Sequence, residues 1–310
     1  MKWIKAFAPA TIGNIGPGFD VLGLAVKKIG DIVEARKRSS GVKISSIAYA
    51  GPNVNLSTDP RKNTAGIAAL ETLKILNEKG GVELRLKKGL PLGSGLGSSA
   101  ASAAAAAFAV NHLYGNILTR EDLILPATVA EEAVSGAFFA DNTAPALLGG
   151  ATLTRSCVPL DVTRIGSIKK LKIILVTPEM VILTKEARKI LPKKIHMKNF
   201  IFNMANTALI TAAFAKDDYA LFSRSLNDVV IEPVRSKLIK GFSKVKENAL
   251  KAGADGMSIS GSGPTLFAIT DKLRKARRIE DAMVETFKQF GIKSSHIITE
   301  VDSDGARLVT

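Results

Sequence analysis

The sequence is poor in cysteine and histidine. It contains one cysteine, Cys157, and three widely separated histidines, His112, His196 and His296. A single cysteine excludes an internal disulfide and fits a reducing compartment. The histidines show none of the close spacing that zinc sites require. These absences argue against a disulfide-stabilised secreted scaffold and against a zinc-binding domain.

Long hydrophobic runs are also lacking. The longest mainly apolar run, residues 100–110, is rich in alanine and too short to span a bilayer. The first residues, MKWIKAFAPATIGN, lack the unbroken apolar core of a signal peptide. We therefore expect a cytoplasmic protein with no membrane partner. Aromatic residues make up only 5% of the chain, so the core must rest on alanine, valine, isoleucine and leucine.

Acidic residues are outnumbered. The chain has 28 Asp and Glu residues and 43 Lys and Arg residues, which gives a net charge of +15 and a general attraction for anions. The one dense basic run, DKLRKARR at residues 271–278, mixes signs as a solvated helix face does. No zinc spacing, aromatic RNA-binding motif or continuous basic arm accompanies the charge, so no nucleic-acid partner is predicted. A non-catalytic protein that binds anions or nucleic acid remains the alternative from another class.

Strand and helix patterns mix without a regular βαβ alternation over the 310 residues. Such a mixture predicts two α+β domains with largely antiparallel sheets, which we place at residues 1–168 and 169–310. The expected strands are residues 2–10, 31–38, 42–50, 82–87 and 171–176, with a strand-turn-strand at 255–270. The expected helices are residues 63–80, 98–114, 126–137, 200–215, 233–251 and 281–290.

A glycine-rich stretch, LPLGSGLGSS, precedes an alanine-rich helix. Gly93, Gly95 and Gly97 stand directly before Ser98, where that helix is predicted to begin. A helix N-terminus offers unpaired N–H groups and partial positive charge, and glycines let the backbone approach an anion closely. The stretch matches neither the P-loop nor the dinucleotide fingerprint. It is either a backbone phosphate nest or an ordinary turn, with Ser98 and Ser99 free to cap the helix, bind phosphate or ligate Mg²⁺.

Two further features favour the phosphate-binding interpretation. Glu131 shares a helical stripe with Ala127, Val134 and Phe138, whereas Glu132 lies on a more polar stripe. A carboxylate on an apolar face is costly unless it is paired or holds a metal, so Glu131 is either an ion-pair partner of a lysine or a metal ligand. A second glycine-rich stretch, SISGSGPT at residues 258–265, is either a plain hairpin turn or a turn that faces the first across a nucleotide.

Together these stretches resemble the GHMP family of small-molecule kinases. LPLGSGLGSSAAS is similar to the family's ATP loop, and ISGSGPT is similar to its C-terminal glycine-rich motif. Residues 8–26, 136–150, 183–192 and 228–239 resemble the homoserine kinase branch. The motifs stand in family order over nearly the whole chain.

The resemblance implies an α+β fold of two domains. The N-terminal domain would be like domain 2 of ribosomal protein S5 and the C-terminal domain ferredoxin-like. It also implies ATP-dependent phosphorylation of the L-homoserine side-chain hydroxyl to O-phospho-L-homoserine, in threonine biosynthesis, by a homodimer.

The resemblance also assigns residues to the nucleotide. The implied ATP-binding residues are Asn63, Pro91, Leu92, Gly93, Ser94, Gly95, Leu96, Gly97, Ser98, Ser99, Ala100 and Ala101. Ser99 and Glu131 would hold Mg²⁺. Asn63 could equally be a helix N-cap, and Lys88 could add a cation or be a solvated strand residue.

For the acceptor, the implied binding residues are Asn14, Asp20, Asn142, Thr184, Arg188, Arg235 and Gly261. Asp20 would hold the ammonium group, and the guanidinium groups of Arg188 and Arg235 would hold the carboxylate. Other branches of the family place an Asp base beside the acceptor hydroxyl, where this chain has Asn142. Catalysis by Asn142, Glu131 and Ser99 would then rest on alignment and charge neutralisation. The neighbouring Asp141 is expected to be structural.

Two positions depart from the homoserine branch. Phe139 replaces the usual histidine, and Ile12 and Gly13 stand where the branch has a serine and an alanine. Both changes predict a more apolar acceptor pocket. A kinase for another small hydroxylated acid, of the shikimate or mevalonate type, is therefore the nearest alternative.

Overall fold

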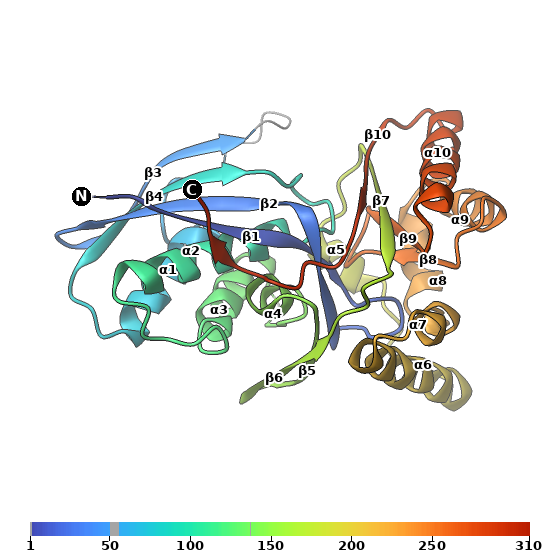
Figure 1. The fold of residues 1–310 in the computed structure, drawn as a ribbon, viewed down its shortest axis with the longest axis horizontal. Helices are drawn as coiled ribbons and strands as arrows, with labels where there is room; N and C mark the ends of the chain where they lie inside the picture. Colours follow the sequence, from blue (N-terminus) through green and yellow to red (C-terminus); the bar gives the residue numbers. More distant parts are fainter. Residues whose placement is uncertain (1, 50–55, 137) are drawn as a thin grey trace.

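Two β-sheets organise the chain in the computed structural model, which describes residues 2–49, 56–136 and 138–310 (Figure 1). The first sheet has seven strands. They are β1 (Ile4–Gly13), β2 (Leu22–Arg38), β3 (Gly41–Tyr49), β4 (Gly81–Lys88), β5 (Ala151–Cys157), β6 (Leu160–Gly166) and β11 (Arg307–Leu308). Their order is β11-β1-β2-β4-β3, with β5 paired to β2 and β6. Only the β3–β4 pair is parallel in this sheet as described.

Four helices cover one face of the first sheet: α1 (Thr64–Ile75), α2 (Ser98–Leu113), α3 (Ile124–Ser135) and α4 (Thr143–Leu148) (Figure 1). The alanine-rich α2 lies between β1 and β2 on one side and α1, α3 and α4 on the other. Its alanines from Ala100 to Ala109 are fully buried. Their small side chains let α2 pack closely on all sides, so its N-terminus is fixed at the centre of the molecule.

The second sheet has the order β10-β7-β9-β8, and every pair in it is antiparallel. Its strands are β7 (Lys172–Pro178), β8 (Gly256–Ile259), β9 (Leu266–Thr270) and β10 (Ser294–Thr299). The helices α9 (Phe242–Lys251) and α10 (Leu273–Gln289) pack on it. The shorter α5 (Thr184–Lys189), α7 (Tyr219–Ser225) and α8 (Glu232–Arg235) and the long α6 (Met197–Lys216) complete this half.

The proposed domain boundary falls between the strands of the two sheets, but the C-terminal residues return to the first sheet. We propose the division at residue 168 because β6 ends and β7 begins on either side of it. The last residues nevertheless return to the first sheet, where β11 pairs with β1 and Val301 bridges to Val26. Both termini therefore lie at the same end of the molecule (Figure 1).

Most expected elements are present, but three differ in extent: the strand predicted at 31–38 is the end of the longer β2, the helix predicted at 281–290 begins at Leu273 as α10, and the helix predicted at 233–251 is divided. The alternation predicted for 82–87 is observed, because Val82, Leu84 and Leu86 are buried. The helix predicted over 233–251 is wrong in part: it is split into α8, a 3₁₀ turn (Ser236–Leu238) and α9. Gly241 causes the break, since its φ of +85° is incompatible with a continuous helix. Residues 50 and 137, the last of two predicted elements, lie outside the described residues.

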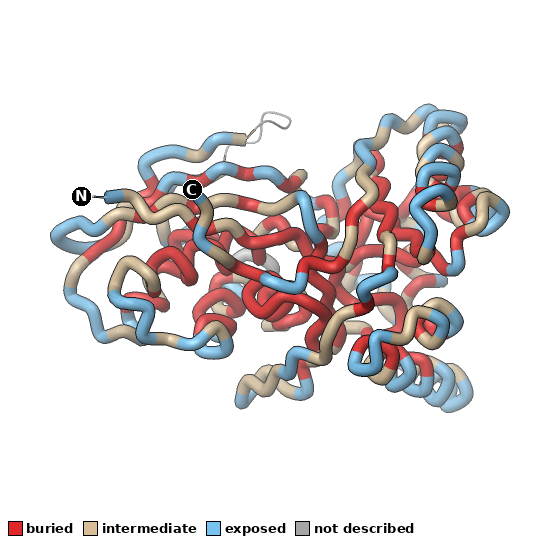
Figure 2. The backbone as a smooth tube through the Cα atoms, viewed as in Figure 1, coloured by how far each residue is buried: buried red, intermediate tan, exposed pale blue. Residues whose placement is uncertain are grey.

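Burial follows the two-layer arrangement, with the most buried backbone between the sheets and their helices (Figure 2). Residues 273–278 of the basic run lie in the first turns of α10, and most of their side chains are exposed to solvent, as expected. None of the helices in the described ranges is both long and apolar enough to cross a membrane.

Candidate functional site

A cavity of about 530 Å³ opens at the N-terminus of α2 and is lined by residues of both halves of the chain. All seven residues predicted to bind the acceptor line it, as do Ser99 and Glu131. Of the predicted loop, Leu92, Gly93, Ser94, Gly95, Gly97 and Ser98 line it as well. The structure thus brings together residues from position 14 to position 261.

The N-terminus of α2 is open towards this cavity. Its N-cap is Gly97, in the left-handed region at φ +63°, and no side chain caps the helix there. By helix geometry the amides of Ser98, Ser99 and Ala100 have no partner within the helix. Ser98 is not a cap, because its hydroxyl donates to the Leu90 carbonyl at 3.3 Å. An open helix N-terminus of this kind, with its dipole, is suited to an anion, which is the use that the sequence predicted for it.

The two glycine-rich turns touch each other. The Ser260 hydroxyl donates to the Gly95 carbonyl at 2.7 Å, and the Thr265 amide donates to the Ser94 carbonyl at 3.1 Å. A Cβ on Gly95 would lie 2.4 Å from the Ser260 carbonyl oxygen. The segment between β8 and β9 is thus a hairpin turn that also packs against the loop before α2 and is hydrogen-bonded to it. Only glycine at position 95 permits this close approach.

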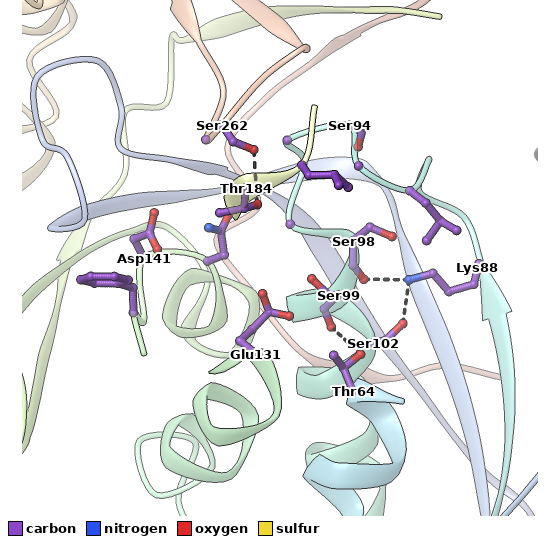
Figure 3. Close-up of a pocket in the computed structure, with 18 of the residues that line it drawn as sticks. Thr64, Lys88, Ser94, Ser98, Ser99, Ser102, Glu131, Asp141, Thr184 and Ser262 are labelled. Atoms are coloured by element: carbon purple, nitrogen blue, oxygen red, sulfur yellow. Dashed lines mark hydrogen bonds between the residues drawn. The ribbon is translucent and has the colours of Figure 1, made fainter. Parts of the chain in front are cut away.

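Glu131 lies on α3 beside Ser99, and its carboxylate points into the space between them (Figure 3). Its Oε1 is buried without a hydrogen-bond partner among the described residues. Burial raises the pKa of this carboxyl, against the opposing effects of the Ser99 hydroxyl and the Lys88 ammonium. Glu132 is exposed, as its stripe predicted. A buried carboxylate oxygen without a partner is what a hard cation such as Mg²⁺ would satisfy.

This pair makes a minimal cation site. Nowhere in the described ranges do three or more His, Cys, Asp or Glu side chains gather into a metal cluster. Magnesium commonly takes only one or two protein ligands and completes its shell with water and substrate phosphates. The donor set of Ser99 and Glu131 therefore fits Mg²⁺ in the company of a phosphate.

Lys88 is neither a solvated strand residue nor free to contact a phosphate. Its ammonium forms an ion pair with Asp31. It also donates to the Ser98 carbonyl at 2.7 Å and the Ser102 hydroxyl at 2.8 Å (Figure 3). The second oxygen of Asp31 accepts from the Gly89 amide at 2.9 Å. Because all three protons of the ammonium are used, Lys88 holds the first turn of α2 in place instead of binding a ligand directly.

At the far end of the cavity, Arg188 on α5 forms a two-pronged ion pair with Asp20. Arg188 Nη1 and Nη2 donate to the two Asp20 oxygens at 3.0 and 2.7 Å. The groups predicted to hold the acceptor's carboxylate and ammonium therefore bind each other in this structure. An amino acid that enters must replace this ion pair with its own two charges.

Arg235 and Asn14 complete this end. Arg235 Nη1 and the Asn14 amide both donate to the Gly261 carbonyl, at 2.8 and 3.0 Å, and Asn14 Oδ1 accepts from the Asp20 amide. The Nε atoms of Arg188 and Arg235 are buried without a partner among the described residues. Burial and the nearby Arg188 lower the pKa of Arg235 to about 10. These unused donors are suited to a carboxylate.

Asn142, at the start of α4, lies between the two ends. Its Oδ1 accepts from the Thr11 hydroxyl at 2.8 Å, so its N–H₂ group remains to contact a ligand. A Cβ on Gly97 would lie 2.1 Å from Thr11 Oγ1, and one on Gly13 would lie 2.6 Å from Asp141 Oδ2. Both glycines thus make room for the Thr11–Asn142 contact and for the carboxylate beside it.

Asp141 is a second buried carboxyl of the site, beside Glu131. Burial raises its pKa to about 7, and the negative charges of Asp20 and Glu131 add to this effect. The positive charges of Arg188 and Arg235 oppose it. Burial thus favours the protonated form of this carboxyl at a pH where an exposed aspartate is ionised.

Aromatic rings stack on the two arginines, a contact that the sequence analysis did not predict. The ring centroid of Phe139 lies 4.3 Å from the Arg188 guanidinium, and that of Phe19 lies 4.8 Å from the guanidinium of Arg235. Such stacking stabilises a guanidinium and fixes its plane. The prediction that Ile12 makes the acceptor pocket more apolar is wrong. Strand alternation points its side chain into the core, where it is fully buried.

Some predicted nucleotide residues do not line the cavity. Pro91, Leu96, Ala100 and Ala101 are not on its wall, and the last three are buried. Their backbone shapes the loop, and their side chains do not face a ligand. Asn63 lines the cavity and is also the N-cap of α1: its side chain accepts from the Ala65 amide and donates to the Ser57 carbonyl.

Sequence reasoning missed Asp31, Ser102, Thr11 and Phe19. Asp31 shares its strand face with the buried Val33 and Ala35. The argument applied to Glu131, a charge on an apolar face, would have found it. Thr11 and Phe19 gave no comparable signal, because a threonine in a strand and an aromatic residue are ordinary.

Comparison with known proteins agrees with this geometry. Models of the GHMP kinases N terminal domain and the GHMP kinases C terminal domain match residues 63–150 and 210–289. A homoserine kinase from Arabidopsis thaliana is 46% identical and aligns over 99% of this chain and 84% of its own length. One from Chloroherpeton thalassium is 42% identical over the full length of both.

The crystal structure of a homoserine kinase from Cytophaga hutchinsonii superposes with a TM-score of 0.94 at 42% identity, and the match covers 100% of this chain and 98% of that one. The two-domain α+β fold expected from the motifs is confirmed by this match. The chain belongs to the homoserine kinase family of the GHMP kinases.

Proposed function

We propose that this protein is a homoserine kinase, which transfers the terminal phosphoryl group of ATP to the side-chain hydroxyl of L-homoserine. One observation carries the proposal: a single cavity joins the open N-terminus of α2 and Glu131 to a cluster of opposite charges, Asp20 with Arg188 and Arg235. The first part suits a triphosphate, and the second suits a zwitterionic amino acid. The product would serve threonine biosynthesis.

The nucleotide end would act through main-chain amides. The amides at the start of α2 and the loop of Gly93, Gly95 and Gly97 would bind the phosphates, and Asn63, which lines the cavity, would lie beside the adenine base. Ser99 and Glu131 would hold Mg²⁺, which when bound supplies positive charge against the β- and γ-phosphates.

The acceptor end would orient the hydroxyl. Asp20 would take the ammonium group, and the two arginines would take the carboxylate. Asn142, whose Oδ1 is held by Thr11, would donate its N–H₂ to the hydroxyl oxygen. An amide cannot accept a proton at neutral pH, so the rate would come from alignment and charge neutralisation, and the hydroxyl proton would pass to a phosphate oxygen.

The test is an ADP-release assay with ATP, Mg²⁺ and four acceptors: L-homoserine, L-threonine, shikimate and mevalonate. We expect turnover with homoserine at least about 100-fold above the others, because only an amino acid satisfies both Asp20 and the arginines. Asp20→Ala should raise KM for homoserine strongly while KM for ATP changes little. Comparable turnover of shikimate or mevalonate, or an unchanged KM in Asp20→Ala, would contradict the homoserine assignment.

An alternative from another class follows from the net charge of +15. A non-catalytic binder of anions or nucleic acid would consume no ATP and would lose its ligand steeply as salt is added. The buried Glu131 Oε1, which has no hydrogen-bond partner among the described residues, argues for the kinase, because a carboxylate repels a polyanion unless a cation lies between them. We propose further that the enzyme works in the cytoplasm as a homodimer.

A further inference from the structure

Two buried carboxylates, those of Asp228 and Glu232, lie shortly before Arg235 in the chain and do not line the cavity. They are 6% and 9% exposed. Arg235 itself is 3% exposed and does line the cavity. A carboxylate is costly to bury unless it is hydrogen-bonded or paired, so the contacts of these two show what each holds in place.

Asp228 holds the start of α8, the single helical turn that ends at Arg235. Its Oδ1 accepts from the amides of Val230 and Ile231 at 2.8 and 2.9 Å, and its Oδ2 accepts from the Glu232 amide at 2.9 Å. A helix of four residues has little stability of its own, because nucleation costs more than so few hydrogen bonds return. The turn therefore depends on the amides that Asp228 satisfies, as a helix depends on its cap.

Helix α6 holds Asp228 from another side. The Asn203 amide donates to Asp228 Oδ1 at 2.7 Å, and Asn203 Oδ1 accepts from the Val229 amide at 3.0 Å. Ile201 and Met204 of the same helix are 52% and 53% exposed. A surface helix ordinarily turns its apolar side chains inward. Here α6 turns an asparagine inward instead, and the contact with residues 228 and 229 is what that asparagine provides.

Glu232 ties the same turn to the second sheet. Its carboxylate forms an ion pair with Lys246 on α9. Its Oε2 also accepts from the Ser258 hydroxyl on β8 at 2.8 Å. Three residues further on, Arg235 Nη1 donates at 2.8 Å to the carbonyl of Gly261, in the turn that follows β8. Helix α8 is therefore bound at both of its ends to one short, continuous segment of the chain.

These contacts decide where the guanidinium of Arg235 lies. Residues three apart share one side of a helix, so fixing Glu232 against β8 fixes the side on which Arg235 leaves the turn. Arg235 Nε is buried without a partner in the described part of the chain, so it is free to meet a carboxylate. We infer that Asp228 and Glu232 are positioning residues for the acceptor's carboxylate, which hold Arg235 in the site without touching the ligand. The inference rests on the proposed function, which gives the cavity an acceptor with a carboxylate.

The first experiment compares two buried aspartates that each accept from backbone amides. In Asp228→Asn one accepting oxygen is lost, so an amide at the start of α8 loses its partner. The matched control is Asp302→Asn, since Asp302 is 1% exposed, accepts from the amides of Asp304 and Gly305, and does not line the cavity. Both variants should lower the melting temperature, so a loss of stability does not by itself account for a change in KM.

Only Asp228→Asn should change the kinetics. We expect KM for homoserine to rise at least about tenfold, the effect of losing one hydrogen bond to a charged group, while KM for ATP stays near that of wild type. An unchanged KM for homoserine in Asp228→Asn, or an equal rise in Asp302→Asn, would overturn the inference.

The second experiment asks whether Glu232 acts through Arg235. Glu232→Met removes both side-chain contacts and should raise KM for homoserine at least about tenfold. Glu232→Gln, whose amide is able to accept from Lys246 and donate to Ser258, should restore most of this loss. In an Arg235→Met background, Glu232→Met should raise KM by less than about twofold more, because the group that it positions is already absent. Additive effects in the double variant would show a general structural role and refute the inference.

A crystal structure of Glu232→Met decides the same point without any substrate. We expect Arg235 Nη1 to lie beyond hydrogen-bonding distance of the Gly261 carbonyl, to which it donates at 2.8 Å in the wild type. An unmoved Arg235 would refute the inference whatever the acceptor is. Wild-type protein that does not turn over homoserine would instead contradict the proposed function, and the crystal structure would still decide whether Glu232 positions Arg235.

Discussion

The buried ion pair between Lys88 and Asp31 gives the sharpest stability prediction. The two side chains are 4% and 1% exposed and join β4, β2 and the first turn of α2. Replacing Lys88 with methionine keeps most of the side-chain volume but leaves the Asp31 carboxylate buried with only the Ser102 hydroxyl and the Gly89 amide as donors. Leaving one partner of a buried pair unpaired costs about 3–5 kcal/mol, whereas an exposed pair is worth about 0–1 kcal/mol.

We therefore expect Lys88→Met to lower the free energy of unfolding by about 3–5 kcal/mol. Such a loss is a large share of the roughly 5–15 kcal/mol of a typical domain. Urea unfolding followed by tryptophan fluorescence is a suitable assay. Trp3 is the only tryptophan, and it lies against Arg36 of β2 and Arg85 of β4, so it reports on the sheet that holds the pair.

Two variants separate this effect from a general loss of charge. Lys87→Met, at the exposed neighbouring position of β4, should change stability by less than about 0.5 kcal/mol. Lys88→Met combined with Asp31→Asn should recover at least about 2 kcal/mol of the sum of the single losses, because the neutral amide no longer needs a cation. A loss below about 1 kcal/mol in Lys88→Met, or strict additivity in the double variant, would refute the argument.

Three further predictions concern the site itself. Glu131→Gln should lower kcat at least about 100-fold with little change in KM for homoserine, since it removes the proposed metal ligand. The exposed Glu132→Gln is the control and should have a kcat near that of wild type. A loss of kcat below tenfold in Glu131→Gln would speak against a metal ligand. Because the pKa of Asp141 is raised from 3.8 to about 7, the folded state holds a proton there that the unfolded state has lost, so this group's contribution to stability falls as pH rises from about 4 to 7, by about 4 kcal/mol. The difference in unfolding free energy between Asp141→Asn and wild type should accordingly grow over that pH range, and a pH-independent difference would contradict the raised pKa. A kinetic measurement on the same variant tests its role: if turnover is abolished while both substrate affinities are intact, Asp141 is the catalytic base and not a structural residue. Gly95→Ala should lower the free energy of unfolding by at least about 3 kcal/mol, because its Cβ would lie 2.4 Å from the Ser260 carbonyl oxygen. Gly136→Ala is the control: Gly136 has a similar φ and nothing within 4 Å of an added Cβ, so only the backbone strain of about 1–2 kcal/mol should be lost. Equal losses in thermal or urea unfolding would show that the contact with Ser260 is unimportant.

Local sequence patterns were sufficient for the helix and strand framework. The alternation of β4 and the glycine-rich start of α2 follow from period-two burial and from the conformational freedom of glycine. Glu131 was found because its charge interrupts an apolar stripe. The same signal was present at Asp31 and Lys88, each on the buried face of its strand.

By itself, then, the sequence determined the chemistry of the site: a backbone anion nest, a carboxylate beside it, and a set of charges suited to an amino acid. Only the tertiary structure decided how these groups are used. It joined Arg188 to Asp20 across 168 positions, closed Lys88 into a buried network, and turned the apolar side of α6 outward. The physical reason is that periodicity and propensity act over a few neighbouring residues, whereas partner choice among charges depends on which distant segments the packing of the core brings within hydrogen-bonding distance.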